Sequence, residues 1–238
     1  MSTREKPLRV CVVIPAYNEE VAIGNVVREM KKALVSSSFA GDIVVIDDGS
    51  KDDTANVAEK AGATVVRHIL NSGAGAATST GLSYAERGNY DIAATMDADG
   101  QHIAKDVLRG FSNMLVSGED LLIGSRLIDS KGMSKVKVIG NKGLSIITYL
   151  IFGISSTDSQ SGLRIFSRRS LENLRWRTSG YEYCSEMLWR AKQQGLTISE
   201  YPITAVYTEY SKSKGQSNWN AVNIIKRLLA RRITEILG

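Results

Sequence analysis

The chain has 238 residues, of which 43% are hydrophobic and 23% are charged, and it carries a formal net charge of +5. This composition is ordinary for a globular protein, and no apolar run reaches the roughly 20 residues that a membrane-spanning helix needs. The two cysteines, Cys11 and Cys184, lie far apart and match no metal-binding spacing. They fit a protein of a reducing compartment best.

The first half of the chain alternates apolar runs with segments of helical periodicity. Runs rich in β-branched residues predict buried strands at 8–14, 42–46, 63–68, 91–96 and 121–126. Helices are predicted between them, at 21–34, at 54–62, from the glycine-rich NSGAGA to about 88, and at 103–115. Strands that alternate with helices predict the α/β class, with a mostly parallel sheet covered by helices on both faces.

The second half is less regular. Helices are predicted around 140–155 and at 181–195, and a strand at 197–210 leads into the basic loop SKSKGQS. The segment 212–238 is expected to form this loop and an amphipathic helix. Six of its residues are basic and one is acidic, which accounts for the whole net charge. Such a tail suits an anionic partner, or it is simply a solvated helix face.

Polar and acidic segments follow the predicted strands: PAYNEE, DDGSKDDT, DADGQH and GSR. Because ligands of open parallel sheets bind beyond the carboxyl ends of the strands, these segments predict a binding site. The carboxylates of DDGSKDDT suit ribose hydroxyl and base N–H groups, and the alternative is a turn with a helix cap. The glycine-rich NSGAGAAT follows the third strand rather than the first, which argues against a dinucleotide fold, and no P-loop motif occurs.

The segment DADGQH places two carboxylates and an amide at alternate positions. In an extended stretch alternate side chains point the same way, so Asp97, Asp99 and Gln101 are expected to face one point. Oxygen ligands of this kind suit Mg²⁺ or Mn²⁺, with positions left open for phosphate oxygens. A calcium loop is excluded, because it needs glycine sixth and an acid twelfth, whereas Gly100 is fourth and Leu108 twelfth. A helix cap, the other alternative, explains only one carboxylate.

Five motifs occur together in the order and spacing of a known family: VVIPAYNEE, IDDGSKDDT, MDADGQH, GSR and DSQSGLRIFSRR. Over about residues 8–215 the chain resembles the family 2 glycosyltransferases of GT-A fold, and among them the dolichyl- or polyprenyl-phosphate mannose and glucose synthases. The resemblance implies an inverting, metal-dependent transfer of a hexose from a UDP- or GDP-sugar to a polyprenyl phosphate. It implies a catalytic domain at 1–211, with a nucleotide-sugar half at about 8–126 and an acceptor half at about 127–211.

The resemblance also implies residue roles. Contacts to the nucleotide sugar are expected from Pro15, Tyr17, Asn18, Glu19, Asp47, Asp48 and Asp97. The metal is expected on Asp97, Asp99 and Gln101. The acceptor phosphate is expected on Arg126 and on a second basic residue, for which the chain offers Lys142, with the basic loop adding Lys212 and Lys214. Asp97, Asp99 and Arg126 are assigned to catalysis. Relatives often carry a basic residue in the glycine-rich segment, which NSGAGAATSTG lacks.

The acceptor decides whether the reaction needs a base. A lipid phosphate is already anionic and needs cations that hold it in line for attack, whereas a saccharide hydroxyl must be deprotonated. For a hydroxyl acceptor, which is the alternative function, Asp158 and Glu182 are the candidate bases unless they merely pair with Arg164 or Arg168. The excess of Lys and Arg in the second half favours the phosphate.

A polyprenyl phosphate acceptor lies in the bilayer, so the protein is expected in the cytoplasm, peripheral on the cytoplasmic membrane face. The apolar run 144–154 and the C-terminal helix are candidates for contact with the membrane surface. The alternative is that both pack in the core. We expect no nucleic-acid partner, because a basic nucleic-acid-binding module would leave DADGQH unexplained and the tail offers only Trp219 for stacking.

Overall fold

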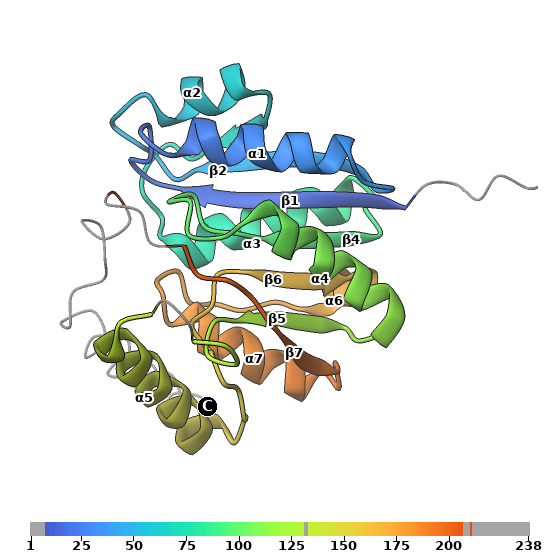
Figure 1. The fold of residues 1–238 in the computed structure, drawn as a ribbon, viewed down its shortest axis with the longest axis vertical. Helices are drawn as coiled ribbons and strands as arrows, with labels where there is room; N and C mark the ends of the chain where they lie inside the picture. The colour runs from blue at the N-terminus through green and yellow to red at the C-terminus, as the bar shows by residue number, and fades with distance from the viewer. Residues whose placement is uncertain (1–7, 131–132, 207–209, 211–238) are drawn as a thin grey trace, which may run out of the picture.

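The computed structural model describes residues 8–130, 133–206 and 210. Within them it contains the strands β1 (Arg9–Ala16), β2 (Ala40–Asp47), β3 (Thr64–Arg67), β4 (Ile92–Thr95), β5 (Leu121–Ser125), β6 (Arg164–Ser167) and β7 (Ile198–Pro202). They form one seven-stranded sheet in the order β3-β2-β1-β4-β6-β5-β7 (Figure 1). β6 runs antiparallel to both of its neighbours, and every other adjacent pair is parallel. The predicted α/β class with a mostly parallel sheet is confirmed.

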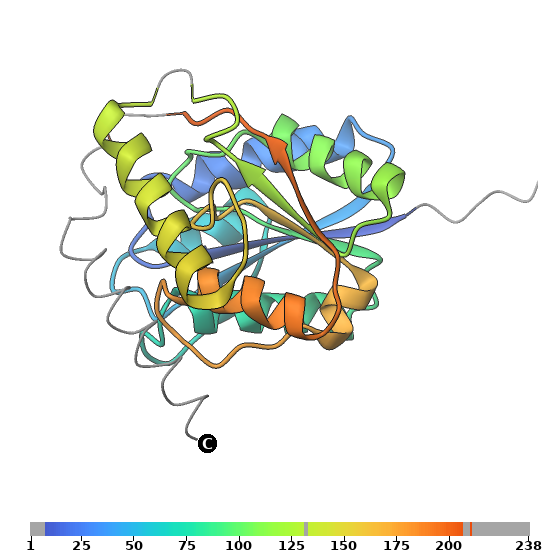
Figure 2. The same cartoon turned by 90° about the horizontal axis from the view of Figure 1, so that it is seen from below.

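Helices cover both faces of the sheet (Figure 2). Their bounds are α1 (Ile23–Val35), α2 (Thr54–Ala61), α3 (Ala74–Arg87), α4 (Ala104–Ser117), α5 (Lys135–Phe152), α6 (Arg168–Asn173) and α7 (Tyr183–Gln193). One hydrophobic core contains side chains of α1, α2 and α4, and the other contains side chains of α3, α5, α6 and α7. The crossovers from β1 to β2 and from β2 to β3 run in one direction along the sheet, so α1 and α2 lie on the same face. The crossover from β3 to β4 runs in the opposite direction and places α3 on the other face, as right-handed crossovers require.

The alternation of side chains along β1 explains why the strand reads as a continuous apolar run. Val10 and Val12 enter the core with α1 and α4, whereas Cys11 and Val13 enter the core with α3 and α7. All four are fully buried. Because both faces of the sheet are covered, both sets of alternate positions must be apolar.

The second half departs from the prediction in two places, and one prediction falls outside the described residues. The segment DSQSGLRIFSRR was expected only as a motif, but its residues 164–167 form β6 and the helix α6 follows directly. The strand predicted at 197–210 ends at Pro202, at the edge of the sheet, where a proline costs no ladder hydrogen bond. The predicted basic loop and C-terminal helix lie outside the described residues.

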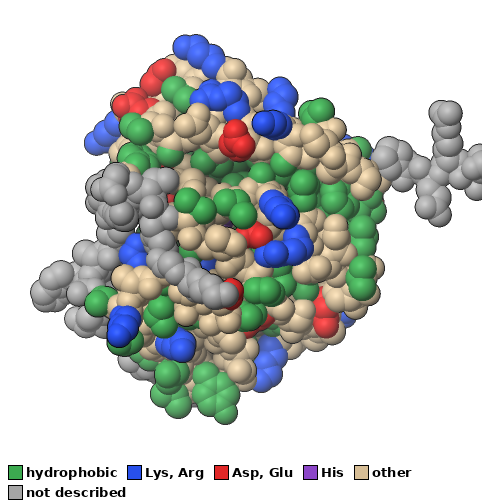
Figure 3. Space-filling view, in the orientation of Figure 1, with side chains coloured by type: hydrophobic (Ala, Val, Ile, Leu, Met, Phe, Trp, Pro, Cys, Tyr) green, Lys and Arg blue, Asp and Glu red, His purple; other side chains and the backbone are tan. Residues whose placement is uncertain are grey.

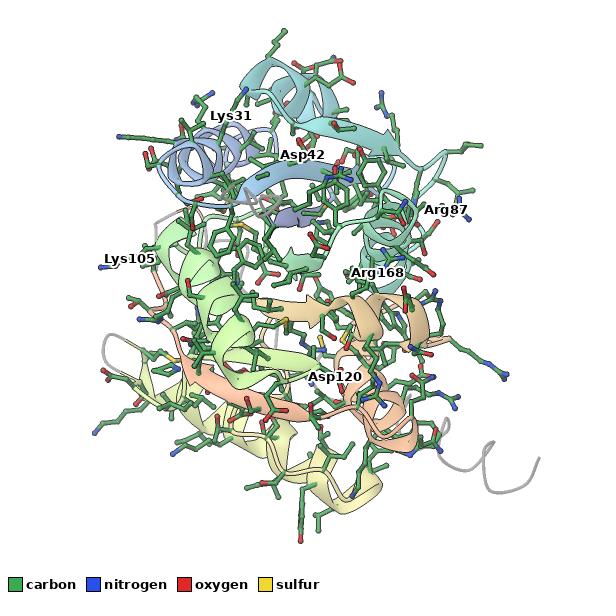
Figure 4. The ribbon with its side chains drawn as sticks, turned by 90° about the vertical axis from the view of Figure 1, so that its right-hand side faces the viewer. Lys31, Asp42, Arg87, Lys105, Asp120 and Arg168 are labelled. Atoms are coloured by element: carbon green, nitrogen blue, oxygen red, sulfur yellow. The ribbon has the colours of Figure 1, made fainter. Side chains whose placement is uncertain are left out.

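At the edge of the sheet where β2 and β5 begin, hydrogen bonds and ion pairs connect neighbouring elements and stabilise the fold (Figure 4). Asp42 accepts a hydrogen bond from the Tyr90 hydroxyl at 2.7 Å. Asp120 pairs with Arg169 at 2.9 Å. Arg168 donates to the backbone carbonyl of Glu86 at 2.9 Å, which ties α6 to α3. These contacts lie at the opposite edge from the strand ends that carry the predicted site residues.

Candidate active site

The carboxyl ends of β1, β2 and β4 lie at one edge of the sheet, on the left in Figure 1. The loops after β1 and β2 are joined there by hydrogen bonds. The backbone N–H of Asn18 donates to Ser50 Oγ at 2.9 Å, and the N–H of Lys51 donates to Asn18 Oδ1 at 2.9 Å. Asn18 has a φ of 53°, a left-handed conformation that asparagine adopts more readily than most other residues. The structure thus brings the predicted PAYNEE and DDGSKDDT segments together.

Asp47 ends β2 with its side chain fully buried. Its Oδ1 accepts a hydrogen bond from the Ser50 N–H at 3.0 Å, and Arg67 Nε lies 2.9 Å from its Oδ2. A cavity of about 310 Å³ opens beside this pair, lined by Gly49, Ser50, Arg67, His68 and Ile69. Its wall offers charged and hydrogen-bonding groups of the kind that hold a nucleoside.

Asp48, the next residue, fixes the glycine-rich loop. Its Oδ1 accepts from the backbone N–H of Ser72 at 2.9 Å and lies 2.7 Å from His68 Nδ1, while Oδ2 accepts from the Gly73 N–H at 2.8 Å. The other ring nitrogen of His68 lies 3.0 Å from Thr80 Oγ1. The carboxylate of Asp48 therefore already has three partners. If Asp48 also contacts the nucleoside, as the sequence predicts, the nucleoside becomes an additional partner of this carboxylate.

The remaining predicted nucleoside residues lie on or after β1. Pro15 is half-buried near the end of the strand, and Tyr17 is 39% exposed. Glu19 is held at both ends: its backbone N–H donates to Thr54 Oγ1 at 2.8 Å, and its Oε2 accepts from the Tyr210 hydroxyl at 2.7 Å. Tyr210 is the last described residue, so the end of the described chain returns to the loop after β1 at this point.

DADGQH is not extended beyond Asp97, so the expectation that alternate side chains face one point along a strand is wrong. Ala98 and Asp99 form a turn, and Gly100 has a φ of 78°. Asp99 accepts hydrogen bonds from the backbone N–H and the side-chain amide of Gln101. The turn itself, rather than strand periodicity, brings the amide to the second carboxylate.

The two carboxylates of this turn affect one another's protonation. Burial and the negative charge of Asp97 raise the pKa of Asp99 above its ordinary value. Burial also tends to raise the pKa of Asp97, but His102 and two nearby arginines outweigh it, so that the pKa of Asp97 is lowered. The negative charge of Asp97 thus makes Asp99 harder to ionise. A cation bound between the two carboxylates would favour the ionised form of both.

The donor set fits a divalent metal that the substrate helps to hold. Among the described residues, no group of three or more His, Cys, Asp or Glu side chains is arranged to hold a metal by itself. Asp97 and Asp99, with the amide of Gln101, supply a few oxygen ligands at a half-exposed position. Mg²⁺ is bound in this way in phosphate-transfer sites, by one or two carboxylates together with substrate phosphates.

Arg126, which follows β5, forms a bidentate ion pair with Asp158. Its Nε donates to Asp158 Oδ2 at 2.7 Å and its Nη2 to Oδ1 at 2.8 Å, and its backbone N–H donates to Oδ2 at 3.1 Å. The Asp158 side chain is fully buried. Asp158 does pair with an arginine, as the alternative to a base role supposed, but its partner is Arg126 rather than Arg164 or Arg168.

A second cavity, of about 470 Å³, lies between α5 and the loop before Asp158. Its lining combines a cation, hydroxyl groups and apolar side chains: Leu127, Lys142, Ser145, Ile146, Tyr149, Ser155, Ser156 and Thr157. Glu200 of β7 holds the loop, since it accepts from Ser156 Oγ at 2.6 Å and from the Thr157 N–H at 2.9 Å. The structure thus places Lys142 beside an apolar hollow near the Arg126 loop. Lys212 and Lys214 lie outside the described residues.

Both histidines of the chain pair with predicted site aspartates, and the sequence analysis assigned neither. His68 lies against Asp48, and His102 Nε2 lies 3.0 Å from Asp97 Oδ2. The position of His102 inside DADGQH was a signal that could have been used. Arg164 was predicted only as an alternative ion-pair partner, but it is a fully buried guanidinium that donates to three backbone carbonyls. A charged residue in a short strand gives no recognisable pattern in the sequence.

The family model described as glycosyl transferase family 2 matches residues 11–175 of the chain. An uncharacterized protein of Methanocaldococcus jannaschii is 44% identical over 227 residues, which cover 93% of this chain and 91% of that protein. The UDP-N-acetylglucosamine–dolichyl-phosphate N-acetylglucosaminyltransferase of Methanococcus voltae is 37% identical over 248 residues, covering 95% and 97%.

Among solved structures, the fold is similar to that of glucosyl-3-phosphoglycerate synthase from Mycobacterium tuberculosis, crystallised with Mn²⁺, UDP-glucose and phosphoglyceric acid. The TM-score is 0.69 at 21% sequence identity, with 94% of this chain and 78% of the other covered. At this identity the likeness concerns the fold alone.

Proposed function

The chain belongs to glycosyl transferase family 2, and from that premise we propose that it moves a hexose from a UDP- or GDP-sugar to a polyprenyl phosphate, with inversion at the anomeric carbon. Its fold is the GT-A fold expected from the sequence. The full-length similarity to a dolichyl-phosphate N-acetylglucosaminyltransferase supports a lipid phosphate as the acceptor. That relative is named for a UDP-sugar, which also supports a nucleotide-activated donor.

The observation that carries the proposal is the pairing of Arg126 with Asp158. A saccharide hydroxyl would need a base that reaches its proton. Asp158 is fully buried and both of its oxygens accept from Arg126, so it is poorly placed for that task. A lipid phosphate needs no base. It needs cations beside an apolar hollow. Lys142 lines the cavity beside α5, and Arg126 directly precedes Leu127, which also lines that cavity.

The donor is proposed to lie across the ends of β1, β2 and β4. Its nucleoside would occupy the cavity beside Asp47 and Arg67, under the loop that carries Tyr17. Its diphosphate would lie over DADGQH, where Asp97 and Asp99 would hold Mg²⁺ or Mn²⁺. The metal would supply Lewis-acid stabilisation of the negative charge on the departing nucleoside diphosphate. The Mn²⁺ in the structure of the mycobacterial synthase supports a divalent ion at such a site.

The protein's own side chains would position the acceptor phosphate and neutralise its negative charge. The phosphate of the acceptor carries its charge before the reaction, so Arg126 would hold one of its oxygens in line with the anomeric carbon. Asp158 would keep the Arg126 guanidinium in one orientation, because a bidentate pair fixes its plane. Lys142 would balance the remaining charge of the phosphate.

The helix α5 gives the proposed acceptor a route from the membrane. Leu144, Thr148 and Phe152 of this helix are buried, whereas Ile146, Tyr149 and Leu150 are exposed. Hydrophobic side chains gather over the lower end of α5, with Lys and Arg side chains near them (Figure 3). A surface that combines apolar and basic groups binds reversibly to anionic bilayers. None of the helices in the described ranges is long and apolar enough to cross a membrane.

The test is a transfer assay with a panel of radiolabelled UDP- and GDP-hexoses, together with UDP-N-acetylglucosamine. Each donor is incubated with Mn²⁺ and with either a polyprenyl phosphate or the polyprenol of the same chain length, and the label in the organic phase is counted. We expect extractable label with the phosphate and one class of donor. The anomeric configuration of the product, compared with that of the donor, reports inversion.

Two outcomes would overturn the proposal. Equal label on the polyprenol would mean that the acceptor phosphate is not used as the nucleophile. Label that stays in the aqueous phase, on an added oligosaccharide, would favour the hydroxyl-transferring alternative within the same family.

A further inference from the structure

Gly162, which precedes the antiparallel strand β6, lies beside the carboxylate of Asp97, the first acidic residue of DADGQH. β4 and β6 pair through Thr95 and Arg164 at the end of their ladder. Continuing the same register by two residues sets Asp97 opposite Gly162. The hydroxyl of Thr95 also donates to the carbonyl of Gly162 at 2.8 Å, which holds the glycine in this place. Residues that face each other across antiparallel strands have neighbouring side-chain positions.

The glycine leaves the space that the carboxylate occupies. A Cβ atom at position 162 would lie 2.1 Å from Asp97 Oδ1 and 2.6 Å from both its Cγ and its Oδ2, and these are the atoms nearest to it. Any larger residue would therefore displace the carboxylate. The backbone of Gly162 does not have the positive φ that favours glycine elsewhere in the chain. The reason for a glycine here is consequently room for Asp97 and not backbone freedom.

His102 restrains the same carboxylate from the other side. Its side chain is 1% exposed, and its Nε2 lies 3.0 Å from Asp97 Oδ2. Its Nδ1 is buried and has no hydrogen-bond partner among the described residues. An imidazole can bond to an ionised carboxylate only by donating, so Nε2 carries a proton in this contact, whether the ring is neutral or charged. The Asp97 side chain is nevertheless 47% exposed, which leaves the carboxylate open toward the site.

We propose that Gly162 and His102 are positioning residues that clamp the carboxylate of Asp97 in the orientation that receives the divalent cation. The inference rests on the proposed metal-dependent function and adds to it two residues that are not metal ligands. It also gives a role to the SQSG segment, which links the acceptor half to the donor site. Groups that orient a ligand carboxylate are often worth roughly 10- to 100-fold in metal affinity.

The test is a titration of Mn²⁺ into the full chain in the presence of saturating UDP, and separately GDP, followed by calorimetry or by the electron paramagnetic resonance of free Mn²⁺. We expect Gly162→Ala and His102→Leu to weaken Mn²⁺ binding by roughly 10- to 100-fold. His102→Gln, whose amide can donate in place of Nε2–H, should recover most of the loss. Gly140→Ala is the matched control, because a Cβ there meets no atom within 4 Å.

The melting temperature of each metal-free variant separates positioning from folding. We expect Gly162→Ala and His102→Gln to melt within a few degrees of the unaltered protein. The inference fails if Gly162→Ala binds Mn²⁺ as tightly as Gly140→Ala does, or if His102→Gln is no better than His102→Leu. If the unaltered protein binds no Mn²⁺ with either nucleotide, the metal-dependent function fails first and this inference fails with it.

Discussion

At the scale of single residues, the candidate site is built from charges that restrain one another. Asp97 is held between His102 and the backbone of Gly162, and Asp158 holds Arg126. Each of these partners lies next to a predicted substrate-binding or metal-binding residue. A substitution at the site therefore changes both the contact to the substrate and the support of a neighbouring residue, and test variants have to keep these two effects apart.

The first prediction concerns Asp99. Asp99→Asn keeps the shape of the side chain and removes its charge, so the proposed metal loses an anionic ligand while the turn is retained. We expect transfer to fall by about 100-fold or more, since the metal contributes several kcal/mol of charge stabilisation and each 1.4 kcal/mol corresponds to tenfold in rate. Initial rates at a series of Mn²⁺ concentrations measure this loss.

Glu29→Gln is the matched control for Asp99→Asn, because Glu29 lies exposed on α1 and loses the same charge. It should leave the rate unchanged. The metal assignment would be wrong if Asp99→Asn retained near-normal turnover. Gln101→Ala should weaken the metal dependence less than Asp99→Asn does, because a neutral amide contributes less than a carboxylate.

The second prediction concerns Arg126. Arg126→Lys keeps a positive charge but loses the planar fork that meets Asp158 at two points. We expect the KM for polyprenyl phosphate to rise by roughly tenfold or more, because a charge-assisted hydrogen bond is worth about 1.5–3 kcal/mol. The KM for the nucleotide sugar should change little. Separate titrations of the two substrates measure both constants, and an equal rise in both would place Arg126 on the donor instead.

Arg126→Ala is expected to behave differently from the lysine variant. It leaves Asp158 buried without its partner, and breaking a buried pair in this way costs roughly 3–5 kcal/mol of folding stability. Chemical denaturation should therefore show a large loss of stability in Arg126→Ala. The double variant Arg126→Met/Asp158→Leu should recover part of that stability but no transfer, which separates the structural role of the pair from its catalytic role.

At the scale of single elements, α5 has both a face packed in the core and an exposed apolar face, whereas core packing and surface contact were predicted from the sequence as alternatives. One face of the helix packs in the core through Leu144 and Phe152, and another exposes apolar side chains that include Tyr149 and Leu150. The helix begins at Lys135, several residues before the predicted start, so its lysine-containing first turns and its apolar last turns belong to one element. A helix of this kind suits the entrance of a lipid-binding site.

The third prediction tests this exposed face. The double variant Tyr149→Ser/Leu150→Ser removes exposed apolar area, so it should leave the melting temperature nearly unchanged. It should weaken binding to vesicles and raise the KM for long polyprenyl phosphates more than for short, soluble analogues, because only the former carry a chain for α5 to contact. Val35→Ser is the control, since Val35 is 81% exposed at the end of α1. If Val35→Ser weakened vesicle binding and raised the KM as much as the double variant does, the proposed role of α5 would be wrong.

At the scale of the whole molecule, the charge is divided unevenly along the chain. Residues from Lys212 onward contain six basic side chains and one acidic side chain, and the rest of the chain sums to zero. These residues lie outside the described part of the structure. Their contribution to membrane binding is therefore a prediction from the sequence, and it can be tested independently of α5.

The fourth prediction is that a chain truncated after Ser211 binds anionic vesicles poorly while its nucleotide half stays folded. Each basic residue near an anionic surface is worth about 1 kcal/mol. Salt should weaken vesicle binding of the full chain strongly but incompletely, because the apolar area of α5 is not screened. Cosedimentation at low and high salt measures both effects. Equal binding by the truncated and full chains would leave α5 as the contact with the membrane.

The periodic first half of the chain was predictable from sequence because its signals are local. Five β-branched runs became strands, and the polar segments after them met at one edge, as parallel pairing dictates. The prediction of Asp47, Asp97 and Arg126 as site residues depended on their positions at or just after the ends of those strands. β6 was missed because a four-residue strand with the buried Arg164 inside it carries no apolar pattern.

The sequence by itself determined the alternation of strands and helices, the edge of the sheet that carries the candidate site, and the carboxylates of DADGQH, since each depends on residues that are neighbours in the chain. Only the tertiary structure decided which partner restrains each charge. Arg126 meets Asp158, and Asp97 meets Gly162, because the antiparallel β6 reverses the chain and returns the SQSG segment to the ends of β4 and β5. Such pairings depend on the register between strands far apart in the sequence, and no local pattern of residues encodes that register.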